Sequence, residues 1–401
     1  MVMDTTIKKG LPDETSVKAG YKQTEIGVIP EDWDVKEMED FTISVASGKS
    51  NTTNELGDYP IYGSTGIIGY KKQSDYAGDK VLIARVGANA GTVNEVSGKY
   101  CVSDNTLMVT YQSGIDINFS YYQLINFKLN KLIFGSGQPL VTGSQIKKIA
   151  FALPKNKTEQ SAIATVLSDT DALIENVEKL ITKKKAIKQS AMQQLLTSKK
   201  RLPGFSGEWE VRKLGEIFSL TATNSKSNFI DDGGNYLIMD MGSVSSVGQM
   251  IASKRTFLSV DPLKIGDLVM PKDDIGGGYI IGKVAYIDQD NKYVLGDHVY
   301  KLTAINSKAD TLFFSYLINS NVINSELKKK VAGSAQLGLG RKSVEEQDVK
   351  IPKDKQEQTA IANILSDMDA EIESLEQKRD KYTMLKQGMM QQLLTGRIRI
   401  S

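Results

Sequence analysis

The 401 residues suffice for two or three domains, and the apolar fraction (40%), charged fraction (24%) and formal net charge (+2) are those of an ordinary globular protein. No apolar run reaches the roughly 18–20 residues of a membrane span, and the first ten residues lack the apolar core of a signal peptide. One cysteine, Cys101, and one histidine, His298, exclude an internal disulfide and a His-rich metal site, and they indicate a reducing cytoplasm.

In chain order, residues 1–20 are expected to form a flexible leader, followed by a globular segment at residues 21–150. Short apolar runs between glycines predict strands at Lys80–Arg85 and Thr106–Thr110, and a helix is expected at Ser120–Leu129. Residues 151–200 then predict a long helix.

A second globular segment is expected at residues 201–350, with strands at Tyr279–Ile287 and His298–Leu302 and a helix at Thr311–Ile318. Residues 351–401 predict a second long helix. Residues 31–150 carry 11 basic against 13 acidic side chains, and residues 207–350 carry 17 against 18. Composition therefore does not by itself predict DNA binding, because such binding usually needs a basic surplus.

The two helical segments are copies of one another. Residues 154–201 align without gaps with residues 352–399, and 26 of the 48 positions are identical. A weaker match at another offset relates Trp33 to Trp209, so the second globular segment is 22 residues longer than the first.

Apolar residues, with one threonine in the first copy, recur at alternating spacings of four and three, the pattern of a coiled-coil seam. They are Ile163, Leu167, Thr170, Ile174, Val177 and Ile181 in the first copy and Ile361, Leu365, Met368, Ile372 and Leu375 in the second. Each helix continues to about Thr197 or Thr395, which is about 60 Å of rod. Polar and aromatic residues beyond Ile181 and Arg379 predict a stutter in the seam.

Each apolar stripe is matched in length only by the other copy, so an intramolecular coiled coil is expected. The predicted fold class is α/β (α+β): two mixed α/β domains separated by two long helices in an antiparallel coiled coil, pseudo-twofold symmetric. Residues 21–30 occupy the place before Trp33 that residues 198–206 occupy before Trp209. Ile26–Pro30 should therefore lie near Arg397–Ile400, at one end of the helix pair.

Several motifs accompany this alternating order. They are YKQTEIGVIPEDWDV at Tyr21–Val35, KKIAFALP at Lys147–Pro154, EQSAIATVLSDTDALIE at Glu159–Glu175, IPKDKQEQTAIANILSDMDAEIE at Ile351–Glu373, and MQQLLT at Met192–Thr197 and Met390–Thr395. From about Lys22 onward the chain resembles the specificity subunits of Type I restriction-modification systems.

The resemblance implies that each globular segment is a target-recognition domain and that the pair reads a bipartite, asymmetric DNA target. The helices would set the unread spacer and dock methyltransferase subunits, two in number, through which restriction-translocase subunits join. The chain itself would be non-catalytic, with no cofactor, no metal and no membrane. The alternative is a scaffold for DNA-modifying subunits that is indifferent to sequence.

The residues agree with an absence of catalysis. No Asn/Asp-Pro-Pro-Tyr/Phe motif for amino-group methylation is present. Gly48-Lys49-Ser50 lacks the first glycine of a phosphate-binding loop, because Ile43 stands there. A nuclease set could be assembled from Asp274, Asp290 and Lys292, but the first segment has no clear counterpart.

Candidate DNA-binding residues lie on glycine-rich turns, where side chains with paired donors and acceptors can meet base edges. In the first domain they are Tyr62, Ser64, Thr65, Lys71, Lys72, Arg85, Asn89, Asn105 and Gln138. In the second they are Lys272, Asp273, Asp274, His298, Gln336, Arg341 and Lys342, with Lys272 to Asp274 in place of the Arg85 turn and His298 in place of Asn105. Tight structural turns are the alternative explanation for these glycines.

Overall fold

The computed structural model describes residues 17–51, 56–133, 139–333 and 337–400. The chain divides into two compact units: Met1–Glu178 with Gln377–Ser401, and Lys179–Glu376. Each unit contains one globular domain and half of each long helix. No helix of the described residues is long and apolar enough to cross a membrane.

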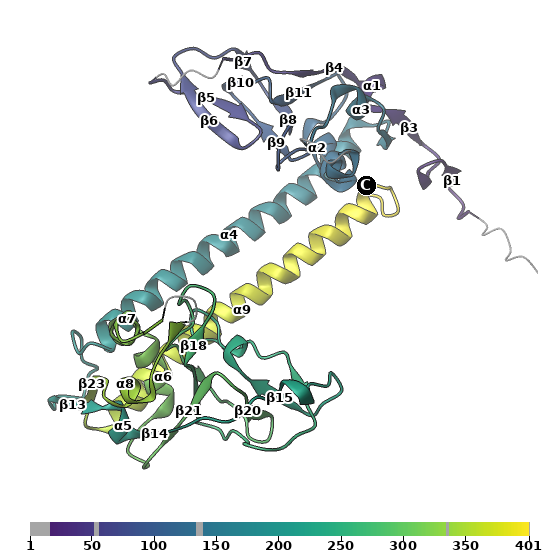
Figure 1. Ribbon diagram of the computed structural model, residues 1–401. Coiled ribbons are helices and arrows are strands. Elements are labelled where there is room, and N and C mark those ends of the chain that lie inside the picture. Colours follow the sequence, from purple (N-terminus) through teal and green to yellow (C-terminus); the bar gives the residue numbers. More distant parts are fainter. Residues whose placement is uncertain (1–16, 52–55, 134–138, 334–336, 401) are drawn as a thin grey trace, which may run out of the picture. The chain divides into compact units, whose positions relative to one another are not determined.

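The first domain is built on two four-stranded sheets (Figure 1). One has the order β4-β11-β8-β9 and comprises Thr42–Ser47, Thr106–Tyr111, Lys80–Ala84 and Val93–Val96. The other has the order β6-β5-β10-β7 and comprises Gly66–Lys71, Tyr59–Gly63, Lys99–Val102 and Tyr76–Ala77, with β5 and β10 parallel. The central strand β8 is buried over most of its length, as its apolar run KVLIA requires.

The remaining elements of the first domain connect the sheets to the helices. They are β1 (Tyr21–Thr24), β2 (Gly27–Pro30), β3 (Trp33–Glu37), α1 (Met38–Phe41), α2 (Ile117–Phe127), η1 (Leu129–Leu132), α3 (Gly143–Lys147) and β12 (Ala150–Pro154). Strand β3 pairs antiparallel with β12, which leads directly into the long helix. Asp116 caps α2 by accepting the backbone N–H of Phe119.

The second domain repeats this plan. Its main sheet has the order β14-β21-β17-β19 (Phe218–Thr221, Val299–Ala304, Leu268–Pro271, Ala285–Tyr286), and a second sheet has the order β16-β15-β20 (Arg255–Thr256, Tyr236–Met239, Tyr293–Leu295). Two further pairs are β13-β23 (Trp209–Lys213, Asp348–Pro352) and β18-β22 (Asp273–Asp274, Leu337–Gly338). The helices are α5 (Leu214–Ile217), η2 (Ser227–Phe229), η3 (Met241–Ser243), α6 (Thr311–Asn319), α7 (Asn321–Lys329) and α8 (Arg341–Glu345).

The two repeated segments form the long helices α4 (Lys157–Leu195) and α9 (Lys355–Leu393). In the first unit the start of α4 packs against the end of α9, and Ile163 and Leu167 share a core with Met390 and Leu393. In the second unit Leu195 shares a core with Ile361 and Leu365. Within each unit the helices are therefore antiparallel, which confirms the predicted coiled coil.

The predicted stutter is wrong. Buried and half-buried positions continue beyond Ile181 at spacings of three and four, through Lys184 and Lys188 to Leu195. Lys188 lies 2.5 Å from Asp369 of α9, so its apolar stem fills the seam while its ammonium is paired. A lysine at a seam position therefore did not shift the phase.

Most short elements are confirmed, with three differences. Residues 279–284 are a loop, and only Ala285–Tyr286 pairs as a strand, because glycines at positions 276–278 precede the apolar run and Gly282 interrupts it. Helix α7 was not expected. Helix α2 begins at Ile117, three residues before the predicted start, because Asp116 supplies the cap.

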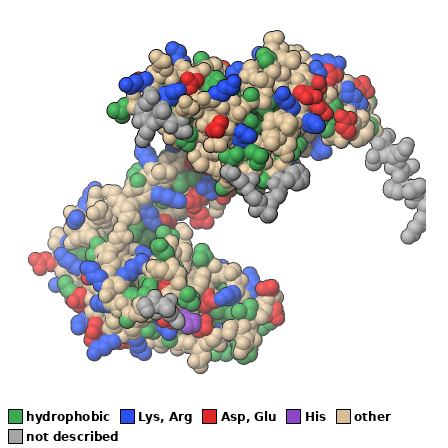
Figure 2. Space-filling view, turned by 45° about the horizontal axis from the view of Figure 1, so that its top comes forward, with side chains coloured by type: hydrophobic (Ala, Val, Ile, Leu, Met, Phe, Trp, Pro, Cys, Tyr) green, Lys and Arg blue, Asp and Glu red, His purple; other side chains and the backbone are tan. Residues whose placement is uncertain are grey.

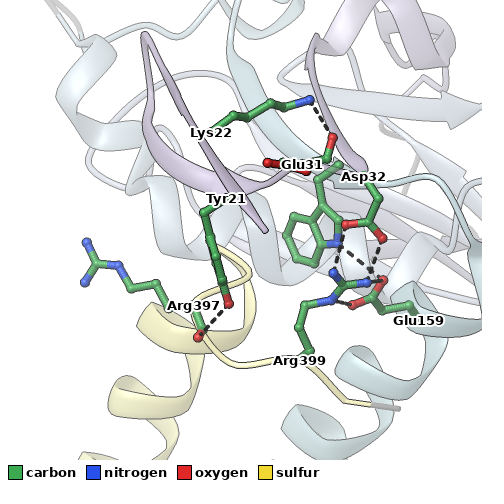
Figure 3. Close-up of polar contacts among 8 residues, drawn as sticks. Tyr21, Lys22, Glu31, Asp32, Glu159, Arg397 and Arg399 are labelled. Carbon is green, nitrogen blue, oxygen red and sulfur yellow. Dashed lines mark hydrogen bonds and ion pairs between the residues drawn. The ribbon is translucent and has the colours of Figure 1, made fainter. Parts of the chain in front are cut away.

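Residues 21–33 meet residues 396–399 in the first unit, as expected (Figure 3). The Tyr21 hydroxyl donates to the Arg397 carbonyl at 3.3 Å. Arg399 donates two hydrogen bonds to Asp32, at 2.8 and 2.9 Å, and also pairs with Glu159 at the start of α4. These bonds hold the pKa of Asp32 below its usual value and raise that of Arg399.

We call this the first clasp: Arg399, Glu159, Asp32 and Trp33, whose indole N–H donates to Glu159 at 3.3 Å. The second unit has its own clasp, formed by Arg201, Glu357 and Trp209. Arg201 donates to both oxygens of Glu357 at 2.6 and 2.8 Å, and its guanidinium lies 6.0 Å from the Trp209 ring centre. Each clasp joins a domain to the helix pair.

A second matched contact fixes each domain. The Tyr122 hydroxyl of α2 donates to Asp171 of α4 at 2.9 Å, and Lys386 of α9 donates to the other oxygen at 2.5 Å. In the second unit Tyr316, Asp369 and Lys188 repeat this arrangement, with the hydroxyl 2.8 Å from the carboxylate. Burial is the main cause that raises the pKa of the tyrosine in both.

Candidate DNA interface

Three turns of the first domain meet at one edge of its sheets, and we call them the first loop cluster: residues 62–66, 85–91 and 103–106. The Ser64 hydroxyl donates to the backbone carbonyl of Asn105. The Arg85 guanidinium donates to the Asp104 carbonyl at 3.3 Å. The structure thus brings together three predicted residues, Ser64, Arg85 and Asn105.

Backbone hydrogen bonds hold these turns. The N–H of Ser103 donates to the Tyr62 carbonyl at 2.9 Å, and the N–H of Arg85 donates to the Asn105 carbonyl at 2.9 Å. The N–H of Val141 donates back to the Arg85 carbonyl at 2.8 Å. The backbone of the turns is fixed by hydrogen bonds among them and with Val141, and the side chain of Asn105 is exposed.

The other first-domain candidates are less uniform. Thr65, Lys72 and Asn89 are exposed. Tyr62 is half-buried and packs edge-on against Tyr100 with ring centres 6.1 Å apart, so much of its ring belongs to the interior.

Lys71 forms an ion pair with Asp75 at 2.9 Å. A hydrogen bond from Ser50, and next the bond from Lys71, hold the pKa of Asp75 below its usual range. Gln138 lies outside the described residues.

The second domain has the same arrangement, which we call the second loop cluster: residues 239–241, 272–282, 296–298 and 339–342. The N–H of Gly296 donates to the Met239 carbonyl at 2.9 Å, as Ser103 does to Tyr62. The N–H of Lys272 donates to the His298 carbonyl at 3.0 Å, as Arg85 does to Asn105. The N–H of Leu339 donates to the Lys272 carbonyl at 2.7 Å, as Val141 does to Arg85.

Charged side chains gather in the second cluster. The Asp273 carboxylate is hydrogen-bonded to His298 Nδ1 at 2.7 Å and forms an ion pair with Lys272 Nζ at 3.2 Å. His298 has a positive φ of 59°, and its ring is exposed on the second unit, where it is the purple side chain of Figure 2. A non-glycine residue held at positive φ is uncommon, and such strain is concentrated at functional sites.

The structure corrects one expectation, because Asp274 does not face solvent. Its side chain is buried and accepts the backbone N–H groups of Gly276 and Ile280 at 2.6 and 3.0 Å. Asp274 therefore organises the following loop and is not free to contact a base.

Arg341 and Lys342, at the start of α8, are exposed. Arg341 pairs with Glu345 at 2.7 Å and Lys342 approaches Glu346 at 3.8 Å, both within one turn of helix. Gln336 lies outside the described residues.

A cavity of about 290 Å³ opens beside His298 and Asp297, and sequence reasoning did not find it. Lys226, Asp240 and Lys254 also line it. Lys226 is buried and donates to the Leu295 carbonyl at 2.6 Å, and Lys254 donates to Asp240 at 2.5 Å. Within the described residues no group of three or more His, Cys, Asp or Glu side chains could hold a metal ion.

Two globular domains with matched loop clusters, each joined to a half of an antiparallel helix pair, agree with a comparison of the sequence with protein families. The family described as Type I restriction modification DNA specificity domain matches residues 30–188 and 206–382. The chain belongs to this family. The two matched stretches each begin near the opening tryptophan of a domain and end within a long helix.

Two relatives in this family align over nearly their whole length. A Type I restriction enzyme MjaVIII specificity subunit of Methanocaldococcus jannaschii is 28% identical, over 93% of this chain and 94% of its own. A putative MjaX specificity subunit of the same organism is 26% identical, over 95% and 97%. Among solved structures, a Type I restriction-modification S subunit from M. genitalium has a TM-score of 0.66 at 18% identity, covering 90% of this chain and 96% of its own, which shows a shared fold.

Proposed function

We propose that this chain is the sequence-specificity subunit of a Type I restriction-modification complex, which reads a bipartite, asymmetric DNA target. One observation carries the proposal. The two loop clusters have equivalent backbone hydrogen bonds but different side chains, with Arg85 and Asn105 in one and Lys272 and His298 in the other. A common backbone that displays different donors and acceptors is suited to reading two different half-sites.

The chemistry of these side chains fits base edges in a major groove. Arginine and lysine donate to guanine O6 and N7, whereas asparagine pairs with adenine N6 and N7. Arg85 and Asn105 are the main candidates in the first domain, and Asn89 stands on the adjoining loop. In the second, Lys272, Asp273 and His298 form a linked set.

Other exposed residues supply the surrounding contacts in this proposal. Thr65 belongs to the first cluster, and Arg341 and Lys342 belong to the second. Lys72 follows the far end of β6 from the first cluster, so it is not part of this recognition surface. Since both domains are close to neutral in charge, either local basic patches or partner subunits must supply much of the positive field that attracts DNA.

We assign recognition, without chemistry or cofactor, to this chain and place the complex with its DNA in the cytoplasm. Residues 21–150 and 201–350 are the proposed recognition domains, and residues 151–200 and 351–401 the helical spacers. The helix pair is the proposed dock for two methyltransferase subunits, which in turn bind restriction-translocase subunits.

To test the proposal, the chain is co-purified with its methyltransferase partner. The complex is then footprinted on DNA that carries the sequence it methylates. The expected result is two protected half-sites of unrelated sequence, separated by a spacer whose sequence does not matter. The matched variants Arg85→Ala and Lys272→Ala should each relax one half-site and leave the other intact. Uniform protection of any sequence would instead support the scaffold alternative.

A further inference from the structure

The loop that follows Lys272 differs from its counterpart in the first domain. In the first domain the N–H of Gly91 donates to the Ala84 carbonyl at 2.8 Å and closes a loop that carries Asn89. In the second the N–H of Gly282 donates to the Pro271 carbonyl at 3.1 Å and closes the equivalent loop. The second loop is four residues longer, and these residues belong to the stretch IGGGY at positions 275–279.

This longer loop is held in a defined conformation. The buried carboxylate of Asp274 accepts two of its N–H groups, those of Gly276 and Ile280. Gly277 has a φ of +94°, and a Cβ there would stand 3.1 Å from the ring of Tyr279. The glycines therefore permit a turn that larger residues would strain, and the Tyr279 ring lies over the backbone at Gly277.

The loop exposes apolar surface. Ile275 is 71% exposed and Tyr279 is 66% exposed. Their loop begins at β18, the two-residue strand whose first member, Asp273, bonds to His298. Large apolar side chains held in solvent next to a polar recognition surface are typical of an interaction site.

We propose that Ile275 and Tyr279 are specificity-determining residues that enter the major groove of the second half-site and contact the 5-methyl group of a thymine. Duplex DNA is the occupant because the loop starts beside the candidate DNA-binding residues Lys272, Asp273 and His298. This inference rests on the function proposed above. The thymine methyl is the apolar group that a base pair presents in that groove. The first domain places an amide, Asn89, on the corresponding loop.

The test measures binding of the purified complex with its methyltransferase partner to a target duplex, by fluorescence anisotropy. Tyr279→Ala should weaken specific binding about tenfold, the factor expected when about 55 Å² of apolar contact is lost. Tyr279→Phe should bind within about twofold of the wild type, because the ring is kept. Deoxyuridine placed at each thymine of the second half-site should weaken wild-type binding at one position. At that position it should weaken Tyr279→Ala less, because only Ile275 remains to contact the methyl group.

A matched pair controls for general effects of removing exposed apolar surface. Ile275→Ala should weaken binding, whereas Ile305→Ala should not, because Ile305 is 55% exposed but follows the opposite end of β21 from the loop cluster. Wild-type affinity in Tyr279→Ala, or an equal loss on non-specific DNA, would overturn the inference while the split footprint stands. If the wild type gives no split footprint, the function proposed above fails first.

Discussion

The second clasp offers a quantitative test of what holds a recognition domain to the helices. The Glu357 side chain is 3% exposed and that of Arg201 is 26% exposed. Replacing Arg201 with alanine removes the bidentate partner of a carboxylate that water cannot reach freely. Breaking a buried pair by deleting one partner costs about 3–5 kcal/mol, and the partial exposure of Arg201 places this case at the lower end.

We therefore expect Arg201→Ala to lower the free energy of unfolding of the second unit by about 3 kcal/mol, which is roughly 8 °C in Tm for a unit of this size. Adding Glu357→Gln should recover part of the loss, because a neutral amide is less costly to bury than an unpaired carboxylate. Arg212→Ala is the control, because it removes an arginine from an exposed ion pair, that with Glu216, and it should leave Tm unchanged.

The assay is urea denaturation combined with hydrogen exchange, which assigns the lost protection to one unit. Exchange in Arg201→Ala should rise in β13 and in the adjoining half of α9 and remain unchanged in the first domain. Stability within about 0.5 kcal/mol of the wild type would refute the reasoning, as would a double variant less stable than Arg201→Ala.

Three further predictions concern other sites. Burial lowers the pKa of Lys283 to about 8, so between pH 8 and about 10.4 the unfolded chain binds more protons than the folded chain. The free energy of unfolding, measured by denaturation, should therefore rise across that window by up to about 3 kcal/mol, and Lys283→Met should flatten the rise. Tyr316→Phe should cost about 1.5–3 kcal/mol by removing a hydrogen bond to the carboxylate of Asp369, a loss that calorimetry would detect. Arg85→Ala should relax reading of the first half-site by about 1–3 kcal/mol in competition binding; equal losses at both half-sites would contradict its assignment.

The architecture could be predicted because it depends on repetition. Glu159 and Glu357 are repeated in the sequence, and both occupy clasps; Asp171 and Asp369 are repeated, and both bind a tyrosine and a lysine. A residue that makes the same contact twice in one chain is retained at both places, and the alignment of the copies displays it. The alignment does not reveal which partner each residue meets.

The loop clusters could be predicted only in part. Arg85 and Lys272 were matched correctly because short buried strands precede both turns. The buried role of Asp274 was missed, because an aspartate that accepts backbone N–H groups has the same sequence context as an exposed one. Tyr279 was assigned to a strand because a glycine-interrupted apolar run has the composition of one.

The division of the chain has a consequence for the order in which it folds during synthesis. The second unit is one continuous stretch, Lys179–Glu376, whereas the first needs Gln377–Ser401 as well. The core of the first unit includes Met390, Leu393 and Leu394, and Gln123 donates to the Leu394 carbonyl. Domains generally fold as they emerge from the ribosome, the N-terminal one first. Here the core of the first unit cannot be completed until Met390–Leu394 has been made, and until then the apolar face of the first half of α4 lacks the residues against which it packs.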